Sequence, residues 1–140
     1  MKVAVFGWYA PNLVRFRASM MRAMVEAGHE VVGLAPGEDP TIIADLAAIG
    51  VGFSTIPIGR TGLNPLEDFL TLRAITVALK EIRPDLLLSY AIKLVIYGPL
   101  AAARVGIPHR HAIITGLGST LMGEGFKMRC MAVVAKWLYR

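Results

Sequence analysis

Short apolar runs that alternate with stretches of helical periodicity are the feature that most constrains the fold of this chain. The first run, Val3–Phe6, contains no polar residue, which is typical of a strand buried on both faces of a parallel sheet. The alternation predicts an α/β, Rossmann-like, doubly wound parallel sheet of about five or more strands with helices on both faces. We expect strands at 2–7, 30–35, 51–58, 86–90 and 109–115, and helices at 14–28, 40–50, 65–83, 94–105 and 126–140.

The composition favours a folded domain, because 55% of the residues are hydrophobic and only 18% are charged. Lys and Arg number 15 against 10 Asp and Glu. This basic excess indicates either an anionic partner, such as phosphate, acidic lipid or nucleic acid, or simply a solvated basic surface. The single cysteine, Cys130, excludes an internal disulfide and fits a reducing cytoplasm. We expect neither a secretory signal nor a membrane span, which would need roughly 18 apolar residues.

The loop 7–12 follows the first strand, where a dinucleotide-binding enzyme would carry G-x-G-x-x-G. That fingerprint is absent, which disfavours an ordinary dehydrogenase. The loop still leads into a helix N-terminus, whose free N–H groups attract phosphate. Arg15 and Arg17, expected in the first helical turn, oppose the helix dipole, so they indicate either a nearby anion or a solvated basic face. The predicted substrate-binding residues of this segment are Gly7, Trp8, Asn12, Arg15 and Arg17.

Further candidates follow the later strands, because ligands of doubly wound sheets bind at the carboxyl ends of the strands. The relevant loops come after Gly7, Ile58, Tyr90 and Thr115. Lys93 either contacts a phosphate or sugar hydroxyl or is an exposed lysine at a helix start. The substrate-binding candidates of these segments are Arg60, Asn64, Tyr90, Lys93, Thr115, Gly116 and Gly118.

Glu124 is the candidate catalytic residue, since it stands between two glycines at a predicted helix start. It acts either as a base or sugar ligand, or as a carboxylate that favours the helix dipole. No second carboxylate stands nearby, so the pair typical of a hydrolase is not visible. His29, His109 and His111 lack metal-ligand spacing. We therefore expect a site without metal or cofactor.

The predicted helix 126–140 is amphipathic, with Met131, Val134 and Trp137 on one face and Arg129 and Lys136 on the other. It is either a core helix or a helix that lies on an anionic membrane surface. It ends at residue 140 without a glycine, proline or polar tail. This ending predicts that the protein continues, although a helix that simply ends the protein is the alternative.

Short motifs spread along the chain carry a family resemblance. Ala27–Val31 reads A-G-H-E-V, Arg83–Asp85 reads R-P-D, Arg60–Pro65 reads R-T-G-L-N-P and Thr115–Gly118 reads T-G-L-G. Further matching motifs lie at 5–11, 14–17, 90–93 and 123–125. Together they resemble the N-terminal domain of bacterial family-4 glycosyltransferases with the GT-B fold. R-T-G-L-N-P and T-G-L-G are the more specific elements, and they resemble the branch that builds capsule, O-antigen and related lipid-linked saccharides.

This resemblance implies metal-free, retaining transfer of a sugar from a nucleotide-sugar to a lipid-linked saccharide in cell-surface polysaccharide synthesis. Residues 1–140 would form the N-terminal, acceptor-side domain, and the C-terminal domain that holds most of the donor would be absent, so the chain alone would be inactive. The implied location is cytoplasmic, peripheral at the inner face of the bacterial cell membrane. Thr115 and Gly116 stand where many family members carry a histidine, which leaves Glu124 as the substitute candidate.

Two other classes of function stay open at this point. One is a non-catalytic subunit that anchors a separate donor-binding chain at the membrane. The other is a nucleotide- or nucleic-acid-binding module, which the basic charge permits. Because aromatic and basic residues are thinly interleaved, we expect no nucleic-acid partner.

Overall fold

The computed structural model describes residues 1–58, 65–91 and 94–113. Strands and helices alternate throughout this part of the chain. The predicted helix 126–140 lies outside the described residues. The elements are β1 (Lys2–Phe6), α1 (Ala10–Glu26), β2 (Glu30–Ala35), α2 (Pro40–Ala48), β3 (Val51–Thr55), α3 (Pro65–Ile82), β4 (Leu86–Tyr90), α4 (Leu94–Val105) and β5 (His109–Ile113).

The five strands form one sheet in the order β3-β2-β1-β4-β5, and every pairing is parallel. Val3 of β1 lies opposite Val31 of β2 on one side and Leu86 of β4 on the other. The chain therefore winds outward from β1 in one direction and then, after β3, in the other. This arrangement confirms the predicted doubly wound parallel sheet, and its topological switch point lies between β1 and β4.

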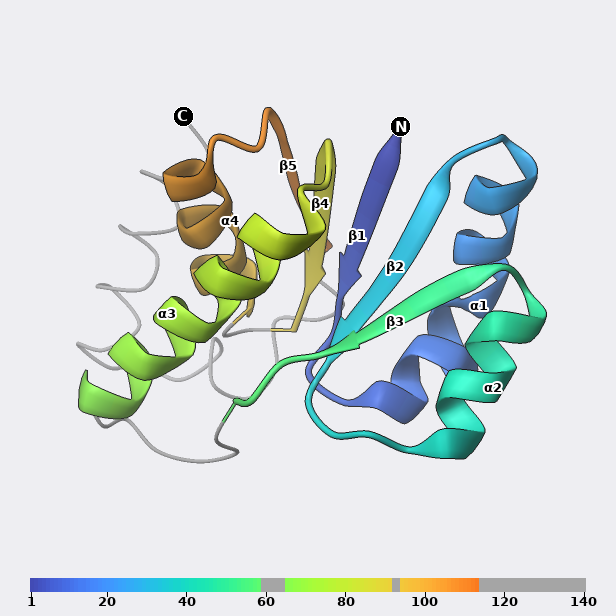
Figure 1. Cartoon of the computed structure of the whole chain (residues 1–140), viewed down its shortest axis with the longest axis horizontal. Helices are drawn as coiled ribbons and strands as arrows, with labels where there is room; N and C mark the ends of the chain where they lie inside the picture. Colours follow the sequence, from blue (N-terminus) through green and yellow to red (C-terminus); the bar gives the residue numbers. More distant parts are fainter. Residues whose placement is uncertain (59–64, 92–93, 114–140) are drawn as a thin grey trace, which may run out of the picture.

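Helices cover both faces of the sheet, as Figure 1 shows, with α1 and α2 on one face and α3 and α4 on the other. The residues of β1 explain how both layers are held. Ala4 and Phe6 point into the apolar cluster beneath α3 and α4, and Val3 and Val5 point into the cluster beneath α1 and α2. All four are buried, which is why the sequence of this strand lacks the polar alternation of a half-exposed sheet.

Helix α1 begins at Ala10, four residues earlier than predicted. Pro11 stands in its first turn, where a proline loses no hydrogen bond and its fixed φ suits the helix. The prediction that Arg15 and Arg17 lie in the first turn is therefore wrong, because they follow the helix start by five and seven residues. Asn12, predicted in the loop, lies instead in the first turn.

The apolar periodicity of helices 40–50 and 65–83 predicts that Ile43 and Phe69 point inward, and this prediction and several element ends differ from the structure. Phe69 of α3 is 61% exposed and Ile43 of α2 is 37% exposed. The first turns of α3, which contain Phe69, extend past the sheet (Figure 1). Helices α1 and α2 end before Gly28 and Gly50, because these glycines take φ values of 84° and 76° that a helix does not allow.

Candidate functional site

A pocket of about 440 Å³ lies at the carboxyl edge of the sheet. Its walls are residues 8–11 after β1, residues 36–39 after β2, and Ile58 beyond the end of β3. Parallel pairing places these three segments together, because the carboxyl ends of parallel strands share one edge. The volume lies in the range of small-molecule sites, roughly 300–1,000 Å³.

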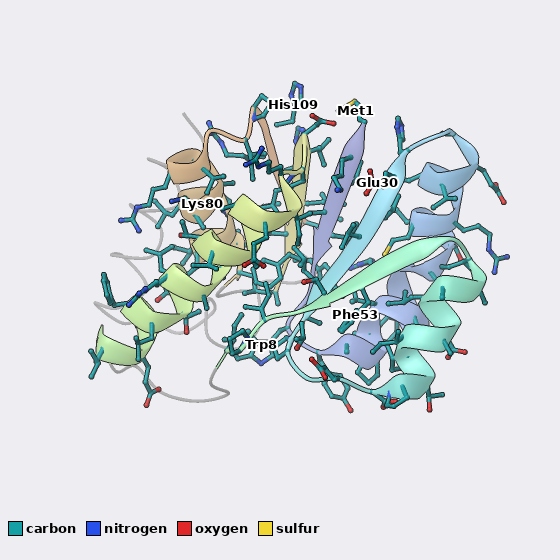
Figure 2. The ribbon with its side chains drawn as sticks, viewed as in Figure 1. Met1, Trp8, Glu30, Phe53, Lys80 and His109 are labelled. Atoms are coloured by element: carbon teal, nitrogen blue, oxygen red, sulfur yellow. The ribbon has the colours of Figure 1, made fainter. Side chains whose placement is uncertain are left out.

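Trp8 is the aromatic wall of this pocket. Its side chain is half-buried and packs against the apolar cluster beneath α3 and α4. Figure 2 shows Trp8 at the carboxyl edge, beside the segment that leaves β3. The ring is therefore held in place by the core while part of its surface faces the pocket.

The segment between β2 and α2 forms the opposite wall. Gly37 takes a φ of 85°, which favours glycine, and its carbonyl accepts a hydrogen bond of 3.1 Å from the Thr55 hydroxyl. Asp39 caps α2, with its Oδ1 accepting from the Thr41 N–H at 2.9 Å. These bonds position Glu38 between them. Glu38 and Asp39 are not among the predicted site residues, although the Pro36-Gly37 turn after the second strand marks another carboxyl-edge loop.

A second group of side chains meets at the switch point between β1 and β4. Gly7 directly follows β1, and a Cβ added to it would overlap the Tyr90 hydroxyl. The Arg17 guanidinium carbon lies 4.8 Å from the centroid of the Tyr90 ring, which is the geometry of a cation–π contact. Three predicted substrate-binding residues, Gly7, Arg17 and Tyr90, are thus brought together in space.

The polar atoms of this group are buried. Burial raises the pKa of the Tyr90 hydroxyl from 10.0 to about 12, and the Arg17 charge opposes this shift in part. Within the described part of the chain, neither the Tyr90 hydroxyl nor Arg17 Nε has a hydrogen-bond partner. The phenol is therefore neutral at physiological pH. Its hydroxyl, which lies beside β1, makes no hydrogen bond to another described residue.

The remaining predicted site residues are placed as follows. Asn12 is half-buried and Arg15 is exposed, and neither lines the pocket. Their roles as substrate-binding residues, like those of Gly7, Trp8, Arg17 and Tyr90, stay predictions. The candidates outside the described residues are Arg60, Asn64, Lys93, Thr115, Gly116, Gly118 and Glu124.

The described ranges 1–58, 65–91 and 94–113 can be compared with what a metal site and a membrane span require. No group of three or more His, Cys, Asp or Glu side chains gathers there in a way that could hold a metal ion. None of the helices in these ranges is both long and apolar enough to span a bilayer.

Comparison with known proteins identifies relatives. A family described as "Glycosyl transferase 4-like domain" matches residues 13–140. A curated relative from Campylobacter jejuni, the N,N'-diacetylbacillosaminyl-diphospho-undecaprenol alpha-1,3-N-acetylgalactosaminyltransferase, is 27% identical over 140 residues. The match covers 100% of this chain and 37% of that relative.

Solved structures share the fold. A UDP-GlcNAc 2-epimerase from Neisseria meningitidis superposes with a TM-score of 0.66 at 15% identity, covering 99% of this chain and 39% of its own. MurG from Acinetobacter baumannii superposes with a TM-score of 0.59 at 19% identity, and the match covers 96% of this chain and 39% of MurG. A glycosyltransferase from Rickettsia africae superposes with a TM-score of 0.62 at 10% identity, and the match covers 86% of this chain and 32% of that protein. In each case this chain spans well under half of the larger protein.

Proposed function

Because the chain belongs to the glycosyl transferase 4-like domain family, we propose that it is the acceptor-side domain of a GT-B glycosyltransferase. In this proposal the acceptor is a lipid-linked saccharide, the donor is a nucleotide-sugar, and a second domain or chain holds most of the donor. The Campylobacter relative supports this reading, because its name states transfer of N-acetylgalactosamine to a sugar-diphospho-undecaprenol. That this chain spans 37% of the relative supports the division into two parts.

The observation that carries the proposal is the hollow carboxyl edge. Loops after β1, β2 and β3 build a pocket there, and the switch-point group of Gly7, Arg17 and Tyr90 lies at the same edge. An edge of this kind forms one wall of a cleft that a second domain would close.

The chemistry assigned to this domain is the positioning of the acceptor. In the transfer, an acceptor hydroxyl forms a bond to the anomeric carbon of the donor sugar. The bond from that carbon to the nucleotide diphosphate breaks, the diphosphate leaves with the bonding electrons, and the hydroxyl proton passes to a base. Glu124 stays our candidate for that base. Holding the acceptor hydroxyl at the donor is the contribution that orientation makes to such a reaction.

The test separates acceptor binding from donor binding by the 140-residue chain. We expect it to bind a water-soluble, short-chain prenyl-diphosphate N-acetylhexosamine at least about tenfold more tightly than a UDP-N-acetylhexosamine, and to show no turnover with both present. Calorimetric titration and a radiolabelled transfer assay measure these quantities. Tighter binding of the nucleotide-sugar, or measurable transfer by the chain alone, would contradict the acceptor-side assignment.

A peripheral position at an anionic membrane forms part of the same proposal. Helix α3 carries exposed apolar side chains at Phe69 and Leu70, which are 61% and 52% exposed. Arg73 and Lys80 lie on the same helix, and Figure 2 shows Lys80 projecting from it. The net charge of the chain is +5. Glu67 and Asp68 precede the two apolar side chains, and Arg73 follows them by one turn. The proposed attraction to anionic lipid therefore rests on the apolar side chains and the net charge of the chain.

Replacing Phe69 and Leu70 together with serine is expected to weaken binding to phosphatidylglycerol vesicles by roughly tenfold or more, because both side chains lose their apolar contact with the bilayer. Co-sedimentation with phosphatidylglycerol and with phosphatidylcholine vesicles measures the effect. Phe16→Ser is the matched control, since Phe16 is 63% exposed but lies on α1 at the other face of the sheet. Equal binding of both variants to anionic vesicles would contradict the proposal that α3 contacts the membrane.

A further inference from the structure

The pocket at the carboxyl edge is acidic, although the chain as a whole is basic. Among the described residues that line it, the charged side chains are Glu38 and Asp39, and none is a Lys or Arg. The net charge of the chain is +5. The acidic lining is therefore a local feature of this pocket and does not follow from the composition.

The two carboxylates differ in their availability. Asp39 is engaged as the cap of α2 through its Oδ1. Glu38 is exposed and, among the described residues, makes no hydrogen bond or ion pair. An ionised carboxylate only accepts hydrogen bonds. Glu38 thus offers acceptor oxygens to a ligand that brings hydroxyl or amide donors.

Trp8 lies in the same pocket and offers an apolar surface. Because its ring packs against the core cluster beneath α3 and α4, its orientation is largely set before a ligand arrives. Ile58, buried beyond the end of β3, adds apolar lining. A ligand that pairs an apolar face with outward-pointing hydroxyl or amide groups matches both kinds of wall, and a pyranose ring has this character.

A phosphate matches the pocket poorly. The first turn of α1 lines it through Ala10 and Pro11, and a helix N-terminus alone attracts anions. Here, however, the described lining of the same pocket holds two carboxylates and no basic side chain to offset them. Both carboxylates are exposed, so water and salt screen their charge. Like charges still repel at short range, so the acidic wall disfavours an anionic ligand, most strongly at low ionic strength.

We propose that the pocket between Trp8 and Glu38 binds a neutral, hydroxyl- or N-acetyl-bearing sugar ring of the acceptor and excludes its diphosphate. This inference rests on the proposed function, because it assigns one part of the acceptor to one part of the acceptor-side domain. Trp8 provides the stacking surface, Glu38 accepts hydrogen bonds from the ring substituents, and the diphosphate lies outside this pocket.

The test uses the fluorescence of Trp8 in the full 140-residue chain. The sequence contains two tryptophans, so Trp137→Phe leaves Trp8 as the single reporter. We expect the methyl glycoside of N-acetylglucosamine to change this fluorescence saturably, and N-acetylglucosamine 1-phosphate to bind about tenfold or more weakly. Glu38→Gln should weaken the affinity for the neutral sugar by about threefold to tenfold. It should also bring the dissociation constants of the neutral and the phosphorylated sugar closer together, because the substitution removes the charge of the side chain while keeping its shape.

The control is Glu26→Gln, the same substitution at the far end of α1 and outside the pocket, which should leave both affinities unchanged. Trp8→Leu should abolish binding of the neutral sugar. Circular dichroism checks that this variant folds, and saturation-transfer NMR measures its binding. The inference is overturned if the phosphate binds as well as the neutral sugar, if neither binds, or if Glu38→Gln changes nothing. Preferential binding of the lipid-linked acceptor over the nucleotide-sugar would still support the proposed function in each of those cases, so the two failures are distinguishable.

Discussion

Replacing Phe6 with alanine is expected to destabilise the chain by about 3–5 kcal/mol. Phe6 is fully buried at the end of β1, where it pairs in register with Leu34 of β2 and packs in the cluster beneath α3 and α4. The substitution removes apolar contacts and leaves a cavity that the neighbouring strands fill only partly. The free energy of unfolding of a small domain is about 5–15 kcal/mol in total, so this substitution is expected to remove a large share of the stability.

Urea unfolding followed by circular dichroism measures the change in the free energy of unfolding. Phe16→Ala is the matched control, because Phe16 is 63% exposed on α1 and a surface truncation of this kind costs about 0.5 kcal/mol or less. Phe6 also directly precedes Gly7 and Trp8, so we expect the folded fraction of the variant to bind saccharide more weakly. A cost below about 1 kcal/mol for Phe6→Ala would contradict the burial described for β1.

Gly98→Ala is expected to destabilise the chain by about 1–3 kcal/mol, although alanine favours a helix over glycine. Gly98 lies within α4, and a Cβ there would overlap the Ser89 hydroxyl of β4. The Ser89 Cβ would lie at a tight 3.3 Å from the new atom, whereas Leu87 Cδ2 at 3.5 Å would be in ordinary contact. Either the buried Ser89 hydroxyl would have to rotate away from the new Cβ, or the helix would have to move from the sheet.

A double-mutant cycle with Ser89→Ala tests the cause of this cost. Ser89 is fully buried, and in the described ranges its hydroxyl has no hydrogen-bond partner. Ser89→Ala alone should therefore be neutral or stabilising, and in its background Gly98→Ala should cost less than about 1 kcal/mol. Gly52→Ala is the control, because its added Cβ meets no atom closer than 3.7 Å. An equal cost of Gly98→Ala in both backgrounds would show that the hydroxyl is not the obstacle.

Strand positions followed directly from the sequence. The predicted strands 30–35 and 86–90 coincide with β2 and β4, because apolar runs bounded by turn residues are a local signal. The start of α1 was less well predicted. The helix starts at Ala10, four residues before the predicted start at residue 14, and the proline at position 11 is the sequence signal for that earlier start. Taking that proline into account would have separated Arg15 and Arg17 from the helix N-terminus.

The candidate site was predicted in part. The rule that ligands bind at strand ends led to Gly7, Trp8 and Tyr90, and all three lie at that edge. Applied to the end of the second strand as well, the same rule would have included Glu38. What no rule of spacing indicates is that Glu38 shares a pocket with Trp8, because 30 residues separate them in the chain.

The sequence alone determined the alternation of strands and helices, the burial of β1 on both faces, and therefore the edge of the sheet at which ligands of this fold class bind. These features are local, since each depends on the period of apolar residues within one element. The tertiary structure alone decided the strand order, the stack of Arg17 on Tyr90 against Gly7, and the acidic pocket beside Trp8. Those features depend on which crossovers place distant segments side by side, and the pattern within a single segment carries no information about that choice.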